Sequence, residues 1–175
     1  MNTLQTIYSR KSVRGFTGDI TQEQLDTLLK TAYAAPIGRA LYDTVHLTVI
    51  KNKDLINRID ANGAAFFGDS SMKPLYGADT YIVVSAKLQP DYNNVGFSNC
   101  AIVVQNMALA AVELGLGACH IWGASVALSK NDELVKELKL PEGFTPCCGL
   151  IVGQTDEVYV ERDIPEGRIQ TAYIK

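Results

Sequence analysis

Residues 99–114 read NCAIVVQNMALAAVEL, an apolar run of helical length with almost no polar face. A helix that is apolar on nearly every side is buried on every side. Ser98 precedes the run as a candidate N-cap, and Gly115-Leu116-Gly117 follows it with glycines that can take a positive φ. We therefore expect a core helix over 99–114, with the rest of the chain folded around it.

Strand patterns lie on both sides of this helix in the sequence. Residues 81–86 and 147–153 are apolar at almost every position, which is typical of strands in the interior of a sheet. Residues 45–50 alternate in polarity, and 118–122 form a fourth candidate strand. Shorter helices are predicted over 2–9, from the cap Thr21 to about Ala34, and over 131–138.

Composition limits the size and class of the protein. The chain has 175 residues, 47% of them hydrophobic, and a net charge of −3, which fits one globular domain over 1–175. The negative charge gives no general attraction to nucleic acid or to an anionic membrane. No apolar run reaches the roughly 20 residues of a membrane span, and the N-terminus lacks a signal-peptide core. We therefore expect a cytoplasmic protein.

The thiols and imidazoles form no recognisable catalytic or metal pattern. Buried free thiols are favoured over disulfides or a zinc site for the four cysteines, which lie in apolar segments without C-x-x-C spacing: Cys100, Cys119, Cys147 and Cys148. His46 and His120 are favoured as hydrogen-bonded core or edge residues over catalytic bases. Phosphate-loop, nucleophile-elbow and complete dinucleotide fingerprints are missing. With no catalytic side chain and no metal expected, an enzyme here needs a cofactor to carry its reaction.

The N-terminal sequence YSRKSVRGF, residues 8–16, gathers three cations in an otherwise acidic protein. Arginine offers a planar fork of donors, lysine a mobile point charge and serine a short hydroxyl, a set that suits a phosphate monoester. The candidate ligands are Arg10, Lys11, Ser12 and Arg14. Because blocks of like charge often simply face water, a solvated basic turn is the alternative.

Four segments in one order resemble the nitroreductase family of FMN-dependent oxidoreductases. They are Arg-x-Ser-x-Arg-x-Phe at 10–16, the helix end at Ala35-Pro36, ELGLG at 113–117, and LPEGFTP at 140–146 before the strand that ends at Gly153. The resemblance implies an α+β sandwich with a central, mostly antiparallel sheet flanked by helices. It also implies a homodimer with one FMN at each of two subunit interfaces, in which the tail from Thr155 to Lys175 extends across the partner and completes its sheet.

The resemblance also implies the residues of the FMN site. Arg10, Ser12 and Arg14 match the family signature for the phosphate and ribityl chain. Residues 36–38 match the stretch against the flavin ring, although Ile-Gly-Arg-Ala-Leu-Tyr replaces the usual polar sequence there, and residues 122–123 match backbone donors near flavin N5. Among the C-terminal cations Arg168 is favoured over Arg162. The implied set is Arg10, Lys11, Ser12, Arg14, Pro36, Ile37, Gly38, Ser71, Lys73, Trp122, Gly123 and Arg168.

The activity implied by the resemblance is a two-electron transfer through FMN. NADH or NADPH would give a hydride to flavin N5, and a small-molecule acceptor such as a nitroaromatic or quinone would then be reduced in a ping-pong mechanism. One alternative is a flavoenzyme of the same fold with other chemistry, such as reductive dehalogenation or flavin fragmentation. Another is a flavin-binding module without turnover, in which the unusual segment 37–42 has lost the acceptor site.

Overall fold

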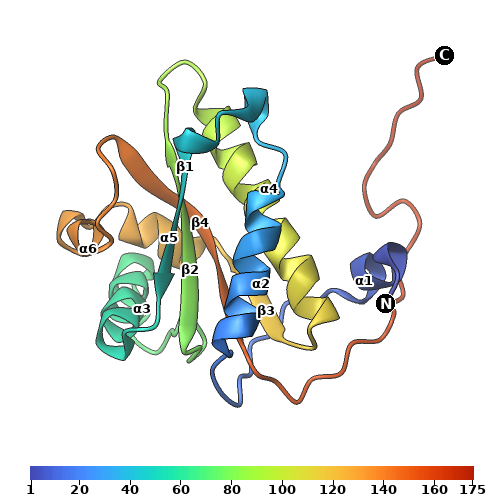
Figure 1. The fold of residues 1–175 in the computed structure, drawn as a ribbon, viewed down its shortest axis with the longest axis horizontal. Coiled ribbons are helices and arrows are strands. Elements are labelled where there is room, and N and C mark those ends of the chain that lie inside the picture. Colours follow the sequence, from blue (N-terminus) through green and yellow to red (C-terminus); the bar gives the residue numbers. More distant parts are fainter.

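A four-stranded antiparallel sheet forms the centre of the computed structural model, which describes all 175 residues. The strands are β1 (Val45–Ile50), β2 (Thr80–Lys87), β3 (Gly117–Ile121) and β4 (Phe144–Gly153), in the order β1-β2-β4-β3. The helices are α1 (Thr3–Ser9), α2 (Gln22–Tyr33), α3 (Lys53–Phe67), α4 (Asn93–Glu113), α5 (Gly123–Leu128) and α6 (Asp132–Glu137), with 3-10 turns η1 (Gly38–Ala40) and η2 (Tyr42–Thr44). Figure 1 shows α2 and α4 on one face of the sheet and α3 and α5 on the other. The predicted α+β fold is confirmed.

The two central strands are buried because helices cover both faces of the sheet. Along β2, Ile82 and Val84 belong to the core beneath α2 and α4, whereas Tyr81 and Val83 belong to the core beneath α3 and α5. This alternation is the two-residue period of a strand. With both faces covered, every position over 81–86 except Ser85 is apolar, which is why this run indicated an interior strand.

Helix α4 differs from the prediction at its start and on its outer side. It begins at Asn93, so Ser98 lies inside the helix and is not its cap. Phe97 is 45% and Ile102 is 37% exposed, so the expectation of burial on every face is wrong: the sheet and α2 cover only one side. By length and composition α4 could cross a membrane, which also corrects the expectation that no run is long enough. Its buried side packs against the sheet and α2, and a cytoplasmic location stays a prediction.

Helix α3 was not predicted from the sequence. It is continuous although Gly63, a residue that disfavours helix, lies within it. Asn52 caps its start by accepting a hydrogen bond from the Leu55 N–H at 3.0 Å. A Cβ atom at Gly63 would lie 2.8 Å from Cγ of Pro74. The glycine therefore permits the loop that precedes β2 to approach the helix closely.

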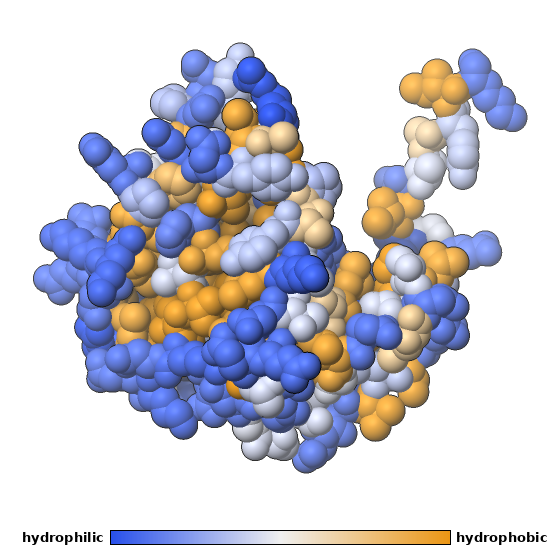
Figure 2. All heavy atoms as spheres, viewed as in Figure 1, coloured by the Kyte–Doolittle hydropathy of each residue, from blue (hydrophilic) through white to orange (hydrophobic).

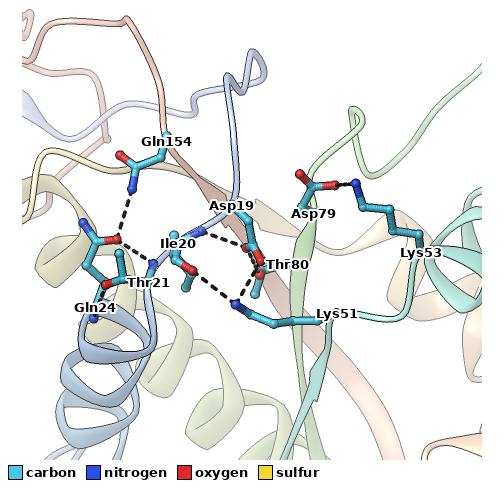
Figure 3. A network of polar contacts seen from close by, with 9 residues as sticks. All are labelled: Asp19, Ile20, Thr21, Gln24, Lys51, Lys53, Asp79, Thr80 and Gln154. Atoms are coloured by element: carbon cyan, nitrogen blue, oxygen red, sulfur yellow. Dashed lines mark hydrogen bonds and ion pairs between the residues drawn. The ribbon is translucent and has the colours of Figure 1, made fainter.

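The segment between the basic cluster and α2 is held on the sheet by Asp19 (Figure 3). The Asp19 carboxylate accepts hydrogen bonds from Thr80 Oγ1 at 2.5 Å, from the Ile20 N–H at 2.8 Å and from Lys51 Nζ at 2.9 Å. Partial burial opposes ionisation of Asp19, but these hydrogen bonds together lower its pKa. The N-terminal segment is thus anchored at one end of β1 and β2.

The C-terminal tail leaves the body of the molecule (Figure 1). Its first part is attached: the Tyr159 hydroxyl donates to Leu116 O at 2.7 Å, and Arg162 Nε donates to Tyr8 O at 2.9 Å. Beyond Arg162 the only hydrogen bond is the local one from Thr171 Oγ1 to Ile169 O, and Tyr173 and Ile174 are 85% and 99% exposed. The end of the tail therefore has apolar side chains with nothing in its own chain to cover them.

Candidate functional site

The basic segment lies beside β3. The Val13 N–H donates to Ala118 O at 2.9 Å, and the Val13 side chain is fully buried. Gly117 makes this possible, because a Cβ there would lie 2.7 Å from Cγ1 of Val13. Since neighbouring residues of an extended chain point to opposite sides, Ser12 and Arg14 lie on the exposed side.

A small cavity of about 160 Å³ lies next to Arg14. Three chain segments form it: the basic segment, the loop that follows α3, and the junction of β3 with α5. Tyr76, His120, Trp122 and Gly123 are among its lining residues, and no acidic residue lines it. The structure thus brings together three of the stretches that the resemblance had assigned to FMN.

Tyr76 holds the guanidinium group of Arg14. Cζ of Arg14 lies 5.4 Å from the centroid of the Tyr76 ring, and the Tyr76 side chain raises the pKa of Arg14. Tyr76 has φ +52 and Gly77 φ +74, a strained turn of a kind that clusters at functional sites. Asp60 secures this turn by accepting the Leu75 N–H at 2.7 Å.

His120 is a residue of this site that sequence reasoning did not include. It is exposed within β3 and lines the cavity with Arg14 and Trp122. Although His120 is solvent-accessible, the surrounding protein partly desolvates its imidazole, and this effect, followed by the charge of Arg10, lowers the pKa of His120. The alternation of β3 is the signal that finds it, because Cys119 and Ile121 are buried while His120 lies on the outer side.

Other residues of the implied set have partners of their own. Lys11 Nζ lies 2.5 Å from Glu157 Oε2 and 5.9 Å from the Tyr159 ring centroid, so it is less available to a phosphate than Arg10 or Arg14. The Ser71 hydroxyl donates to Asp69 at 2.6 Å. Lys73 is exposed on the same loop as Tyr76 and makes no ion pair.

The two C-terminal arginines are placed very differently. Arg168 is exposed in the part of the tail that does not contact the body of the chain. Arg162 instead donates from Nε to Tyr8 O at 2.9 Å and from Nη2 to Ile7 O at 3.3 Å, two and three residues before Arg10 in the sequence. Within one chain, Arg162 is the C-terminal cation that lies beside the basic segment.

Residues 36–38 are not part of the Arg14 cavity. They follow α2, and the Gly38 N–H donates to Oδ1 of Asn99 in α4 at 3.1 Å. Ile37 and Gly38 line two other cavities, and neither cavity shares a residue with the one beside Arg14. A single chain therefore separates the implied FMN residues into two groups.

The molecule is thus an α+β protein with a cationic site on the edge of its sheet, formed by the strained Tyr76 turn, the β3–α5 junction, and Arg10 and Arg14, which have no acidic partner. Comparison with known proteins identifies this type. The model of the nitroreductase family matches residues 7–154. The chain belongs to the nitroreductase family.

Individual relatives agree with this assignment. The chain is 29% identical to "FMN reductase (NADPH)" of Bacillus subtilis over 87% of its own length and 65% of the relative. It is 27% identical to "NADPH-flavin oxidoreductase" of Vibrio harveyi, over 89% of its own length and 67% of the relative. The chain thus spans about two thirds of the length of these curated relatives. A solved nitroreductase with bound FMN from Desulfitobacterium hafniense superposes with a TM-score of 0.85 at 27% identity, with both chains fully covered.

Proposed function

We propose that the chain is an FMN-binding domain and a reductase that uses NADH or NADPH to reduce a small-molecule acceptor. The observation that carries the proposal is the pair Arg10, which is half-buried, and Arg14, which is exposed: neither has an acidic partner, and the cavity beside them has no acidic lining. Two like charges without a counterion favour an anionic ligand. The names of the two curated relatives and the FMN in the related structure support FMN as that ligand.

The residues around the cavity fit a phosphorylated flavin in chemistry as well as charge. The guanidinium groups of Arg10 and Arg14 and the Ser12 hydroxyl would hold the phosphate and ribityl chain. The backbone N–H groups of Trp122 and Gly123 donate to no protein acceptor, so they are free to donate to the edge of the ring. Phe67 lies against Gly123, where a Cβ would come within 3.1 Å of its ring.

The roles of the chain are positioning and electrostatic stabilisation. When bound, FMN would supply the redox chemistry, taking up two electrons and a proton from the nicotinamide donor and passing them to the acceptor. The N–H groups of Trp122 and Gly123 would stabilise negative charge at the ring edge. We infer that donor and acceptor, such as a nitroaromatic or a quinone, use the same open face in turn, which is a ping-pong mechanism.

We also propose that the active form is a homodimer. In one chain, residues 36–38 and the Arg14 cavity are separate, and a two-fold axis can place the former from one subunit beside the latter of the other. The exposed side of α4, with Phe97 and Ile102, supports the same assembly because it presents apolar surface to solvent.

The edge of the sheet offers a place for the partner's tail. β1 pairs only with β2, so its outer edge has unpaired backbone groups. Beside it is an apolar cavity of about 500 Å³ between α2, β1 and α4, lined by Ala32, Tyr33, Ile37, Tyr42, Val45, His46, Leu47 and Val103. Figure 2 shows an apolar hollow in this region, bordered by hydrophilic residues. A tail with exposed Ile169, Tyr173 and Ile174 matches this hollow in chemistry.

The visible spectrum of the purified protein tests the proposed function. We expect the bands of an oxidised flavin and their bleaching when NADH or NADPH is added without oxygen, followed by recovery when menadione or nitrofurazone is added. Colourless protein that does not take up FMN would contradict flavin binding. Yellow protein that neither nucleotide bleaches would favour the binding module without turnover, and bleaching without recovery on any such acceptor would favour other flavin chemistry.

The thiols should be dispensable for this reaction. Three of the four are buried and all are free, although Cys119 lines the Arg14 cavity. Replacement of Cys100 or Cys147 by alanine should lower the free energy of unfolding by roughly 0.5–3 kcal/mol, as core truncations do, and leave flavin reduction by NAD(P)H intact. Urea unfolding and stopped-flow absorbance measure the two effects. Loss of reduction in a folded, flavin-loaded variant would show that a thiol takes part.

A further inference from the structure

A second cationic cavity, of about 440 Å³, lies at the amino end of α4 and is separate from the Arg14 cavity. We infer that it binds the anionic group, a carboxylate or a phosphate, of a small molecule. The position of this cavity beside the partner's flavin rests on the proposed function. Four features of the cavity itself support the binding of an anion.

The cavity contains two cations and no acid. Arg39 and Lys87 both line it, and neither takes part in an ion pair. Two like charges that share a cavity repel each other, and an anion placed between them removes that repulsion. Arginine and lysine are also the side chains that bind carboxylates and phosphates most strongly.

Asn99 places a fixed amide group at the wall of the cavity. The residue is 6% exposed, and its Oδ1 accepts the Gly38 N–H at 3.1 Å. This hydrogen bond fixes the orientation of the amide, and Nδ2 makes no hydrogen bond within the protein. Nδ2 is therefore a donor that is free to bind an anion in the cavity.

The amino end of α4 adds a positive electrostatic potential. The helix is 21 residues long, no side chain caps its start at Tyr92, and Val95 and Gly96 of its first turns line the cavity. The Val95 N–H already donates to Tyr92 O at 3.0 Å, so the helix start favours an anion through its dipole. Asn99, which also lines the cavity, lies one turn further along the same helix.

The turn that carries Arg39 is strained. Arg39 has φ +58 and Ala40 has φ +55, although neither is glycine. Conformations of this kind persist where the surroundings hold them, and they cluster at ligand sites. Leu41 and Val95 give the cavity an apolar wall as well, so the ligand that fits has an anionic group on a compact apolar or aromatic body.

Two sources of such a group are compatible with the proposed reaction. Gly38 belongs both to this cavity and to the segment that we place against the partner's flavin. The anion is therefore either a carboxylate on the acceptor or the 2′-phosphate of NADPH. Matched ligand pairs separate these sources: 4-nitrobenzoate against neutral 4-nitrobenzamide, and 2′-AMP against adenosine.

Isothermal titration calorimetry of the full-length protein tests the inference. We expect one charged ligand to bind at least about tenfold more tightly than its neutral partner, and this preference to disappear in the double variant Arg39→Gln, Lys87→Gln. Lys130→Gln, which removes an exposed and unpaired lysine elsewhere, should keep it. Loss of the nitrobenzoate preference identifies an acceptor carboxylate, and loss of the 2′-AMP preference identifies the donor phosphate. Equal preferences in the wild type and the double variant would overturn the inference.

The calorimetry also separates this inference from the proposed function. It needs no turnover, so a colourless protein that binds one charged ligand through Arg39 and Lys87 would contradict FMN binding and keep the anion site. A yellow protein that NADH or NADPH reduces, but that binds neither charged ligand more tightly than its neutral partner, would support the proposed function and contradict the anion site. Circular dichroism and thermal unfolding of each variant exclude misfolding as the cause, and the single variants Arg39→Gln and Lys87→Gln replace the double variant if it does not fold.

Discussion

Removal of residues 163–175 should convert the protein from a flavin-loaded dimer to a monomer that does not retain FMN. These residues make no hydrogen bond or ion pair with the rest of their own chain, and their apolar side chains are largely exposed. Burial of one large apolar side chain contributes about 1.5–3 kcal/mol. Loss of Tyr173 and Ile174 alone would therefore weaken the proposed tail contact by on the order of a hundredfold or more. Light scattering and the visible flavin absorbance after gel filtration measure the two losses.

The position of the cut makes this experiment specific. A cut before Thr155 would also remove Glu157, Tyr159 and Arg162, which hold the basic segment and the start of β3. A cut after Arg162 keeps those contacts. As a matched pair, Ile174→Ser should weaken the dimer and Lys175→Ser should not. A truncated protein that remains a flavin-loaded dimer would contradict the exchange of tails.

Replacement of Arg10 by alanine should weaken FMN binding by roughly 10- to 100-fold. Removal of one partner of a charge-assisted hydrogen bond costs about 1.5–3 kcal/mol, and each 1.4 kcal/mol is about tenfold in affinity. Riboflavin lacks the phosphate, so its affinity should change little. Fluorescence titration of the refilled apoprotein with both flavins measures the difference.

The controls for Arg10 separate phosphate binding from folding. Lys130→Gln removes an exposed cation that no ion pair holds and should change neither affinity. Equal losses for FMN and riboflavin in Arg10→Ala would indicate a folding defect. Unchanged affinity for both would favour the solvated basic turn that the sequence left open.

Some elements could be predicted from the sequence because they depend on local interactions. The capping box of α2 joins Thr21 and Gln24, three residues apart, and the predicted start of that helix is confirmed. The strands over 81–86 and 147–153 are also confirmed, since burial on both faces leaves runs that are apolar at almost every position. The start of α4 was predicted too late, because its first turns contain polar residues, and α3, which contains Gly63, was not predicted.

The sequence by itself thus determined the central strands and the basic segment, because residues close in the chain carry those signals, whereas the fold class followed from the resemblance to the nitroreductase family. Only the tertiary structure decided which residues share a site. Arg14 meets Tyr76 and His120 because β3 passes beside the N-terminal segment, and Gly38 bonds to Asn99, 61 positions away, because α2 packs on α4. Such pairings depend on how strands and helices are connected in space. No periodicity or spacing within a single segment encodes them, so the second cationic cavity could not be found without the fold.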